Sequence, residues 1–375
     1  MVPAADPRAG DRAISASIAA GRREPLAKKR VTLADLAAAA GVSGTTASLV
    51  LTGRGSELRI STAVQERVRE TADRLGYRPN AVSIGLRKGT TRTLGFISDN
   101  VATSQLAGDM ILGALQAARE HGFMLFIAET EQSGNAERDL IHAMQDRQVD
   151  GVVLATMFTR THKVPAGLTH PTVLLNSVPT SRLELNAVVP DELEAGRAAA
   201  RLLIERGHRK IYLVGAGPRL TDVPPDSIAG TERLQGIGEA LRAAGIEPAG
   251  YFAMPDWTPP YGRAAVRELL QQDPSPGALI CFNDRVAFAA YQVLGEAGLR
   301  IPHDVSIVSF DDYEIASWMR PGLTTFALPH KEMGRRAVEL LIAQIDRGDT
   351  PVEPPAIHRI PLTLHTRESV ASPAE

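Results

Sequence analysis

A short uncharged stretch, GVSGTTASLVLTG at residues 41–53, carries several hydroxyl side chains. Thr45, Thr46 and Ser48 follow one another within about one helical turn, and each can donate and accept hydrogen bonds. The other side chains of the stretch are small or aliphatic. Its chemistry is therefore close approach and hydrogen bonding to another surface.

The chain around this stretch is basic. Residues 1–92 contain 16 Lys or Arg and 8 Asp or Glu, a net charge of +8, whereas the whole chain has a net charge of -2. The remainder is therefore acidic. A basic N-terminal segment on an acidic body is typical of nucleic-acid contact, although basic tails are often merely solvated. Charge alone leaves both interpretations open.

Other reactive side chains give little support for catalysis or metal binding. Cys281 is the single cysteine, which excludes an intramolecular disulfide, fits a reducing cytosol and predicts an inert buried thiol in an apolar strand. His208 in ERGHRK is expected to be a surface turn residue. Asp311 and Asp312 are adjacent at a strand end, so we expect their carboxylates to point apart rather than to share acid–base work. We predict no metal and no cofactor.

The sequence around the hydroxyl stretch predicts three helices, and the stretch itself forms the second. Thr32 precedes LADLAAAA with Asp35 three residues on, which resembles a capping box, and Gly41 ends that helix. Ser43 can cap a second helix over GTTASLVL, and a third, TAVQERVRETADRL, has apolar residues at helical spacing. Two helices separated by about three residues predict a helix-turn-helix.

From residue 92 the pattern changes to strands alternating with amphipathic helices. Apolar runs such as TLGFIS, DGVVLAT, KIYLVGA and DVSIVSF are typical of parallel strands that are covered on both faces. The number of runs predicts two doubly wound parallel-sheet subdomains, with a ligand cleft between them at the carboxyl ends of strands. The fold class is therefore α/β behind an all-α N-terminal domain.

Composition bounds the remaining organisation. A chain of 375 residues exceeds one hydrophobic core. No apolar run approaches the roughly 18 residues that span a bilayer, and the Ala- and Arg-rich start lacks the apolar core of a secretion signal. We therefore expect a cytoplasmic protein without a membrane partner. The expected parts are a disordered leader (1–30), a helix-turn-helix domain (31–78), a hinge helix or linker (79–91), an N-subdomain (92–188 plus about 325–353), a C-subdomain (189–324 plus about 354–368) and a tail (369–375).

Several motifs in order resemble the lactose-repressor family of bacterial transcription regulators, from about Val31 to Thr366. They include VTLADLAAAAGVSGTTASLVL, RVRETADRLGYRPN, LRKGTTRTLGFI and FNDRVAFAAYQVLGEAGLRIPHDVSIVSFDD. The resemblance implies a periplasmic-binding-protein-like core, a homodimer, binding to double-stranded operator DNA and control by a small sugar-like effector. The protein would then be a repressor or a related regulator, not an enzyme.

The resemblance implies that the second helix reads the major groove, where small side chains permit close approach. Gly44 and Leu49 depart from the family, which often has a larger side chain at the first position and a guanine-reading arginine at the second. The operator sequence is therefore open. Phosphate contacts are expected from nearby basic residues. The implied DNA-contact set is Thr32, Gly44, Thr45, Thr46, Ser48, Leu49, Arg54, Asn80, Ala81, Ser83, Leu86 and Arg87.

The segment YRPNAVSIGL resembles the family's hinge helix. Leu86 would enter the minor groove as a wedge beside its dimer mate, while Asn80 caps and small residues pack the two hinges together. The alternative is that Leu86 folds back on the core. A helix of barely two turns containing Gly85 is too short to be stable alone, so we expect it to order on DNA.

The resemblance also implies an effector site between the subdomains. Its members would be Asp99, Asn176, Arg233, Trp257, Asn283 and Asp311. Arg233 and Asp311 suit hydroxyl oxygens, and Trp257 suits a sugar ring. The alternatives are that Asn283 caps the following helix and that Asp311 is a structural turn residue.

Two other functions are compatible with the same core fold. A nicotinamide-dependent enzyme is disfavoured because KIYLVGAGPRL lacks the third glycine and continues into prolines. A solute-binding protein would need export and has no use for residues 31–90. Whether the effector releases or promotes DNA binding is open. No leucine follows Leu364, so we expect a dimer rather than the family's tetramer.

Overall fold

The computed structural model describes residues 31–78, 90–102, 104, 107–163, 168–180, 185–347 and 354–373. The chain forms two compact units, Met1–Arg87 and Lys88–Glu375. We call them the helical unit and the core unit, and each is described by itself.

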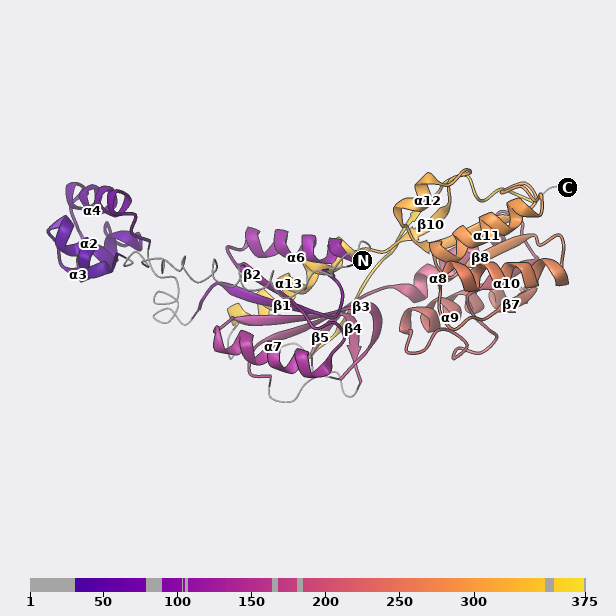
Figure 1. Cartoon of the computed structure of the whole chain (residues 1–375), viewed down its shortest axis with the longest axis horizontal. Coiled ribbons are helices and arrows are strands. Elements are labelled where there is room, and N and C mark those ends of the chain that lie inside the picture. Colours follow the sequence, from indigo (N-terminus) through magenta and orange to yellow (C-terminus); the bar gives the residue numbers. More distant parts are fainter. Residues whose placement is uncertain are drawn as a thin grey trace, which may run out of the picture. The chain divides into compact units, whose positions relative to one another are not determined.

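The helical unit contains the predicted helices α2 (Leu33–Ala40), α3 (Gly44–Leu51) and α4 (Thr62–Leu75) (Figure 1). The Thr32 and Asp35 capping box begins α2, Ser43 caps α3, and Gly41 ends α2 in the left-handed conformation. The three helices enclose a small core. Its buried apolar residues are Leu36, Ala37, Ala40, Ala47, Val50, Val68 and Ala72.

The core unit contains two six-stranded sheets in the described ranges. The N-subdomain sheet has the order β11-β5-β4-β3-β1-β2, and all its pairings are parallel. Its strands are β1 (Thr93–Ser98), β2 (Met124–Glu129), β3 (Gly151–His162), β4 (Thr172–Pro179), β5 (Asn186–Pro190) and β11 (Ile357–Ile360). Its helices are α6 (Gly108–Glu120), α7 (Gly134–Asp146) and α13 (His330–Arg347).

The C-subdomain sheet has the order β12-β10-β9-β8-β6-β7 and is parallel except for β12. Its strands are β6 (Ile211–Val214), β7 (Gly250–Phe252), β8 (Ala278–Cys281), β9 (Ser306–Asp311), β10 (Thr324–Ala327) and β12 (Thr363–His365). Its helices are α8 (Glu192–Glu205), α9 (Ile228–Ala243), α10 (Pro259–Gln272), α11 (Asp284–Glu296) and α12 (Glu314–Trp318). The prediction of two doubly wound subdomains is confirmed.

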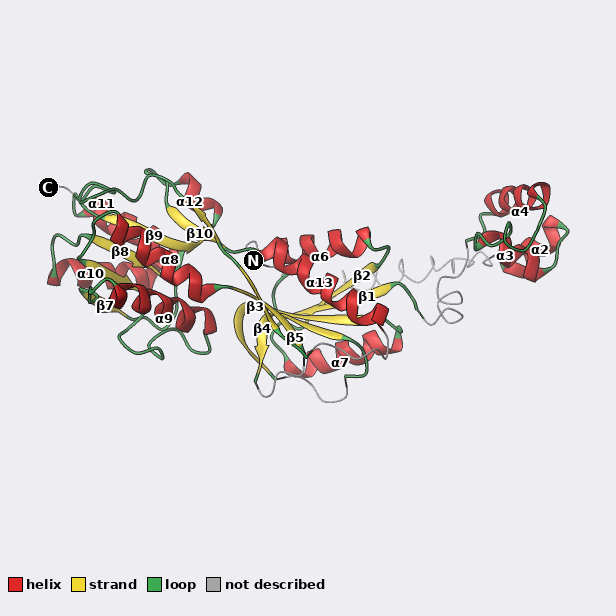
Figure 2. Cartoon of the chain, turned by 180° about the vertical axis from the view of Figure 1, so that it is seen from behind, coloured by secondary structure: helices red, strands yellow, loops and turns green. Residues whose placement is uncertain are grey.

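Helices cover both faces of each sheet (Figure 2). In the N-subdomain, alternate strand residues such as Phe96 and Val153 pack with α6 and α13. Their neighbours Ile97 and Val152 pack with α7 on the other face. Because both faces of the inner strands β1, β3 and β4 are covered, their central residues are apolar, which explains the continuous runs in the sequence.

The chain passes between the subdomains three times, after β5, β10 and β11. This topology corrects the expected boundaries. β10 belongs to the C-subdomain because it pairs with β9, and β11 belongs to the N-subdomain because it pairs with β5. The expected tail is also wrong in part, since Ser369 is fully buried and exchanges hydrogen bonds with Ile307.

Glycines bring two helix pairs into very close contact. A Cβ on Gly113 of α6 would lie 1.9 Å from the Lys331 carbonyl oxygen, and one on Gly334 of α13 would lie 1.9 Å from that of Met110. A second pair, α8 with α9, crosses in the same reciprocal way. There, a Cβ on Gly196 would lie 2.3 Å from the Arg233 carbonyl oxygen.

No single helix in the described ranges is long and apolar enough to cross a membrane. Helices α2 and α3, bent by 101° at their junction, meet the length and composition requirement as a pair.

Candidate functional site

The first candidate site is the outer face of α3 in the helical unit. Gly44 and Thr45 are exposed and Ser48 and Leu49 are partly exposed, whereas Ala47 and Val50 face the core. A Cβ on Gly44 would meet no atom within 4 Å. The fold therefore does not require glycine there, and a side chain at this position would point toward whatever approaches the helix.

Three expected DNA-contact residues have partners inside the helical unit. The Thr32 hydroxyl donates to Asp35 Oδ2 at 2.7 Å as part of the capping box. Arg54 is exposed and pairs with Glu57 at 3.2 Å. The Thr46 hydroxyl lies 2.8 Å from that of Ser43. Thr32 and Thr46 thus stabilise helix starts, and their contact with DNA stays a prediction.

The expected hinge residues Asn80, Ala81, Ser83, Leu86 and Arg87 lie outside the described residues. The wedge and its alternative therefore stay as predicted from the sequence.

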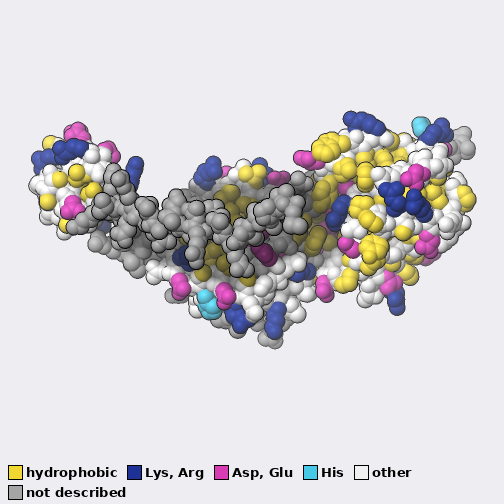
Figure 3. Space-filling model, in the orientation of Figure 1, with side chains coloured by type: hydrophobic (Ala, Val, Ile, Leu, Met, Phe, Trp, Pro, Cys, Tyr) yellow, Lys and Arg dark blue, Asp and Glu magenta, His cyan; other side chains and the backbone are white. Residues whose placement is uncertain are grey.

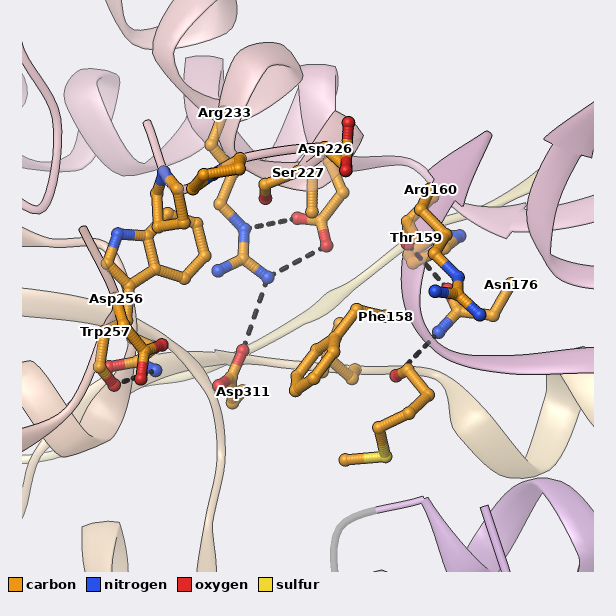
Figure 4. Close-up of a pocket in the computed structure, with 18 of the residues that line it drawn as sticks. Phe158, Thr159, Arg160, Asn176, Asp226, Ser227, Arg233, Asp256, Trp257 and Asp311 are labelled. Carbon is orange, nitrogen blue, oxygen red and sulfur yellow. Dashed lines mark hydrogen bonds and ion pairs between the residues drawn. The ribbon is translucent and has the colours of Figure 1, made fainter. Parts of the chain in front are cut away.

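The second candidate site is a cavity of about 350 Å³ between the N- and C-subdomains (Figure 4). Its size is within the usual range for small-molecule sites. The ends of β3, β4 and β5 contribute from the N-subdomain. Five of the six predicted effector residues line it, namely Asn176, Arg233, Trp257, Asn283 and Asp311.

Arg233 on α9 is the centre of the polar network in this cavity. Its guanidinium is fully buried, donates to both carboxylate oxygens of Glu192 at 2.6 and 2.8 Å, and donates to the Phe282 carbonyl at 2.6 Å. It also pairs with Asp311 at 3.3 Å. Burial opposes its charge, but the Glu192 and Asp311 carboxylates outweigh burial and raise the pKa of Arg233. The guanidinium is therefore fixed and charged.

Asp311 stands at the end of β9 with a strained backbone. Its φ of 108° lies in a region that side chains rarely adopt. Burial raises the pKa of Asp311 to about 6, although the neighbouring Arg233 opposes the shift. Strain and a shifted pKa inside a cavity are typical of a functional residue rather than of a turn alone.

Asn176 and Asp99 position the N-subdomain side of the cavity. The Asn176 amide donates to the carbonyls of Thr156 and Met157 at 3.1 and 3.0 Å, so it fixes the end of β3. Asp99 does not line the cavity. It lies behind the wall, where it pairs with Arg160 at 2.9 Å and accepts from the Met157 backbone at 2.8 Å. Asp99 is thus a positioning residue for Arg160.

Asn283 and Trp257 combine a structural role with a place in the wall. Asn283 caps α11 by accepting from the Val286 backbone at 2.9 Å, so the capping interpretation is correct. Its amide also donates to the Trp257 carbonyl at 3.2 Å. The Trp257 indole donates to the Gly215 carbonyl at 2.8 Å, which fixes the ring that lines the cavity.

Sequence reasoning missed several residues of the wall. Phe158 is 57% exposed at the end of β3 and lies opposite Trp257 and Asp311 in Figure 4. Arg160, Glu192, Arg285 and His330 also line the cavity. Arg285 was detectable because it lies only two residues after Asn283. Glu192 was not, because its pairing with Arg233 depends on how α8 and α9 pack.

The other reactive residues fit structural roles. Burial raises the pKa of the Cys281 thiol, as predicted for an inert buried cysteine. Asp312 points away from Asp311 and pairs with His365 and Arg367, as expected. His208 is a correction: it is buried, its Nε2 lies 2.8 Å from the Ala371 carbonyl, and burial lowers its pKa. The described residues contain no group of three or more metal-ligating side chains.

The loop after β6 is unlike a dinucleotide-binding turn. The next helix, α9, begins at Ile228, far beyond the end of β6 at Val214. A phosphate site of that kind needs the helix to follow the strand directly. The geometry therefore agrees with the argument against a nicotinamide enzyme.

Comparison with known proteins places both sites in context. Residues 32–80 match the model for bacterial regulatory proteins of the lacI family, and residues 200–370 match that for a periplasmic binding protein-like domain. The HTH-type transcriptional regulator CelR of Thermobifida fusca is 34% identical over 332 residues, which cover 86% of this chain and 94% of the relative.

Two solved structures share the fold. A complex of transcriptional regulator CelR with cellobiose has 31% identity and a TM-score of 0.60, and the match covers 91% of this chain and all of that one. The lac repressor dimer bound to operator and the anti-inducer ONPF has 23% identity and a TM-score of 0.74, with 92% of this chain and all of that one covered. At that lower identity the likeness shows the fold alone.

Proposed function

The chain belongs to the lacI family of bacterial regulatory proteins, and from this premise we propose that it is an operator-binding homodimer controlled by a small effector. The observation that carries this proposal is the cavity, whose wall takes residues from both subdomains. A ligand that contacts Arg160 on one side and Arg233 on the other links the spacing of the subdomains to its own binding.

The helical unit supplies the DNA-reading surface in this proposal. Exposed Gly44 and Thr45 lie at the start of α3, the end that meets base edges in a helix-turn-helix. Hydroxyl groups suit phosphates and bases, and the absence of a side chain at Gly44 permits close approach of the backbone. Arg54 and Arg59 are exposed and placed in the same unit for phosphate contact.

The effector class supported by the wall is a polyhydroxylated molecule. Arg233 donates and Asp311 accepts, which suits adjacent hydroxyl groups. Trp257 and Phe158 offer ring faces from opposite subdomains. A sugar between them would draw the subdomains together, and a coupling free energy of about 1–3 kcal/mol changes DNA affinity about 5- to 150-fold.

In this proposal the cavity binds and releases its ligand unchanged, so the protein is not an enzyme, and it acts in the cytoplasm with the chromosome. The CelR complex with cellobiose supports a sugar effector by analogy. A nicotinamide enzyme would bind NAD, and a solute-binding protein would bind sugar without binding DNA.

The test is selection of bound DNA from a random pool by the full-length protein, repeated with a panel of sugars. We expect a palindromic sequence whose affinity falls with added salt, because phosphate contacts release counterions. At least one sugar should change that affinity. Failure to enrich any sequence, with or without sugars, would overturn the proposal.

A further inference from the structure

Among the arginines that line the cavity, Arg285 differs in having no ion-pair partner within 4 Å in the described ranges, although the Asp311 carboxylate interacts with it at longer range. Arg233 pairs with Glu192 and Asp311, and Arg160 pairs with Asp99. Arg285 makes no hydrogen bond or ion pair with any residue of the described ranges, and its Nε is buried without an acceptor. A buried donor left unpaired costs about 1–3 kcal/mol, so this group is poised for an acceptor from a ligand.

The place of Arg285 in its helix strengthens this point. It lies in the first turn of α11, where a cation is unfavourable because the helix dipole is already positive. Two other helix starts contribute to the same wall: Ser227 caps α9 and His330 begins α13. Several positive helix ends around one cavity favour a negative group on the ligand.

The nearby carboxylates leave the Arg285 guanidinium without a direct partner. Asp311 interacts with it only at longer range and is paired with Arg233 at 3.3 Å. Its neighbour Asp284 is fully buried and accepts from Thr325 Oγ1 at 2.7 Å and from the Tyr313 backbone at 2.8 Å. Burial, with a contribution from Asp311, raises the pKa of Asp284 to about 8, so it is largely protonated at neutral pH. Asp226 and Asp256 also line the cavity but are exposed, where water and salt screen their charge.

We propose that the effector is an anionic sugar derivative, carrying a carboxylate or a phosphate, and that Arg285 binds this group. The guanidinium fork fits either group through two parallel hydrogen bonds. The Arg233 and Asp311 pair then takes the hydroxyl groups. This inference rests on the proposed function and names the chemical class of its effector.

Isothermal titration calorimetry of the full-length protein with matched probes tests the proposal. The probes are D-glucose, D-gluconate and D-glucose 6-phosphate, together with cellobiose and cellobionate, all at one pH and ionic strength. We expect an anionic member to bind about 10- to 100-fold more tightly than its neutral parent. Comparison of gluconate with glucose 6-phosphate distinguishes a carboxylate site from a phosphate site.

Variants at position 285 test whether the guanidinium charge, and not the other residues of the cavity, causes the preference for an anion. Arg285→Gln should bind the anionic probe no more tightly than the neutral sugar, and Arg285→Lys should keep part of the preference. Arg300→Gln is the control, because Arg300 is on the surface and pairs with Asp304. Circular dichroism melts verify that each variant is folded.

Equal affinities for neutral and anionic members would overturn the inference. So would an anion preference that survives in Arg285→Gln, or the lack of binding by every anionic probe at millimolar concentration. If a selected operator responds to neutral sugars and Arg285→Gln leaves that response intact, the inference fails while the proposed function stands. If no operator is selected, the proposed function itself fails.

Discussion

At the scale of single residues, one buried guanidinium organises the cavity. Arg233 is 2% exposed. It donates hydrogen bonds to the Glu192 and Asp311 carboxylates, which line the cavity, and to the carbonyl of Phe282, the residue that follows β8. Removing one partner of a buried ion pair leaves a charge that the protein cannot solvate. Stability and ligand response are therefore tied together at this position.

Replacing Arg233 with Lys should reveal this link. Lysine keeps the charge but loses the fork that reaches both Glu192 oxygens and the Phe282 carbonyl. We expect the free energy of unfolding to fall by about 2–4 kcal/mol and the effector response to weaken at least tenfold, measured by urea denaturation and operator-binding anisotropy. Arg300→Lys at the surface should change stability by less than about 0.5 kcal/mol, and an equally mild effect at Arg233 would contradict this view.

Asp284 should make stability depend on pH. Burial and Asp311 raise the pKa of Asp284 in the folded state to about 8, from an ordinary value of 3.8. The folded state therefore binds the Asp284 proton more tightly than the unfolded state does. The contribution of Asp284 to the free energy of unfolding is greatest below about pH 4 and is lost as the pH rises to 8. Its slope approaches about 1.4 kcal/mol per pH unit. In Asp284→Asn, the decline in unfolding free energy between pH 5 and 8 should be shallower, as measured by urea denaturation. Parallel curves for the two proteins would contradict the assignment.

At the scale of elements, the crossing of α8 with α9 sets the position of the site. Gly196 on α8 faces the Arg233 backbone, and Gly236 on α9 faces the Leu193 backbone with a Cβ-to-oxygen separation of 2.1 Å. The two helices carry Glu192 and Arg233 respectively, so their close approach brings the ion pair together. Spacing of these helices is thus part of the site.

Gly196→Ala should therefore destabilise the fold and disturb the cavity. The new methyl group meets backbone atoms, which cannot rotate away, and overpacking of this kind costs about 1–3 kcal/mol. Gly238→Ala on α9 is a matched control, because its nearest neighbour is the end of the Arg242 side chain at 3.9 Å. The control should be neutral or stabilised by up to about 1 kcal/mol. Thermal unfolding of both variants, with effector titration, would refute the idea if Gly196→Ala behaves like Gly238→Ala.

Local signals predicted the elements well. The three helices of the helical unit have caps and terminal glycines within a few residues of each end, so their bounds were correct. Apolar runs likewise identified most strands, because both faces of each sheet are covered. The resemblance to a known family, rather than periodicity, supplied the predicted effector residues.

Long-range packing is what the sequence did not reveal. β11 pairs with β5, far earlier in the chain, so the subdomain boundary near it was wrong. His208 was expected at the surface because its cover, the stretch near Ala371, comes from the other end of the chain. Asp99 was expected in the wall of the cavity. It lies behind the wall, where it pairs with Arg160, and the sequence does not predict this pairing.

At the scale of the whole molecule, the core unit has apolar surface that a partner copy would cover. Exposed apolar side chains include Leu112 on α6 and Met124, Phe126 and Ile127 on β2, the edge strand of its sheet. Trp318 on α12 is 67% exposed. Figure 3 shows apolar side chains gathered on the face of the C-subdomain that is in view. Exposed apolar edges of this kind mark association surfaces.

The double variant Leu112→Glu and Ile127→Glu should weaken the homodimer. Two carboxylates buried in an interface lose their hydration without partners, so we expect dissociation to increase at least tenfold, measured by sedimentation velocity. Tyr261→Glu on α10 is the control, because Tyr261 is similarly exposed but lies on another helix. A wild-type tetramer, or a double variant that stays fully dimeric, would contradict the expected assembly.

Because the chain passes between the subdomains three times, the N-subdomain sheet cannot be completed until late in the synthesis of the chain. The N-subdomain sheet starts at Thr93 and receives its last strand, Ile357–Ile360, after nearly all of the C-subdomain has been synthesised. A ribosome that delivers residues in order must therefore leave the β5 edge unpaired until the end of translation. Neither half can be encoded by one continuous stretch of gene, so recombination that exchanges ligand specificity must exchange both halves together or alter individual residues of the wall.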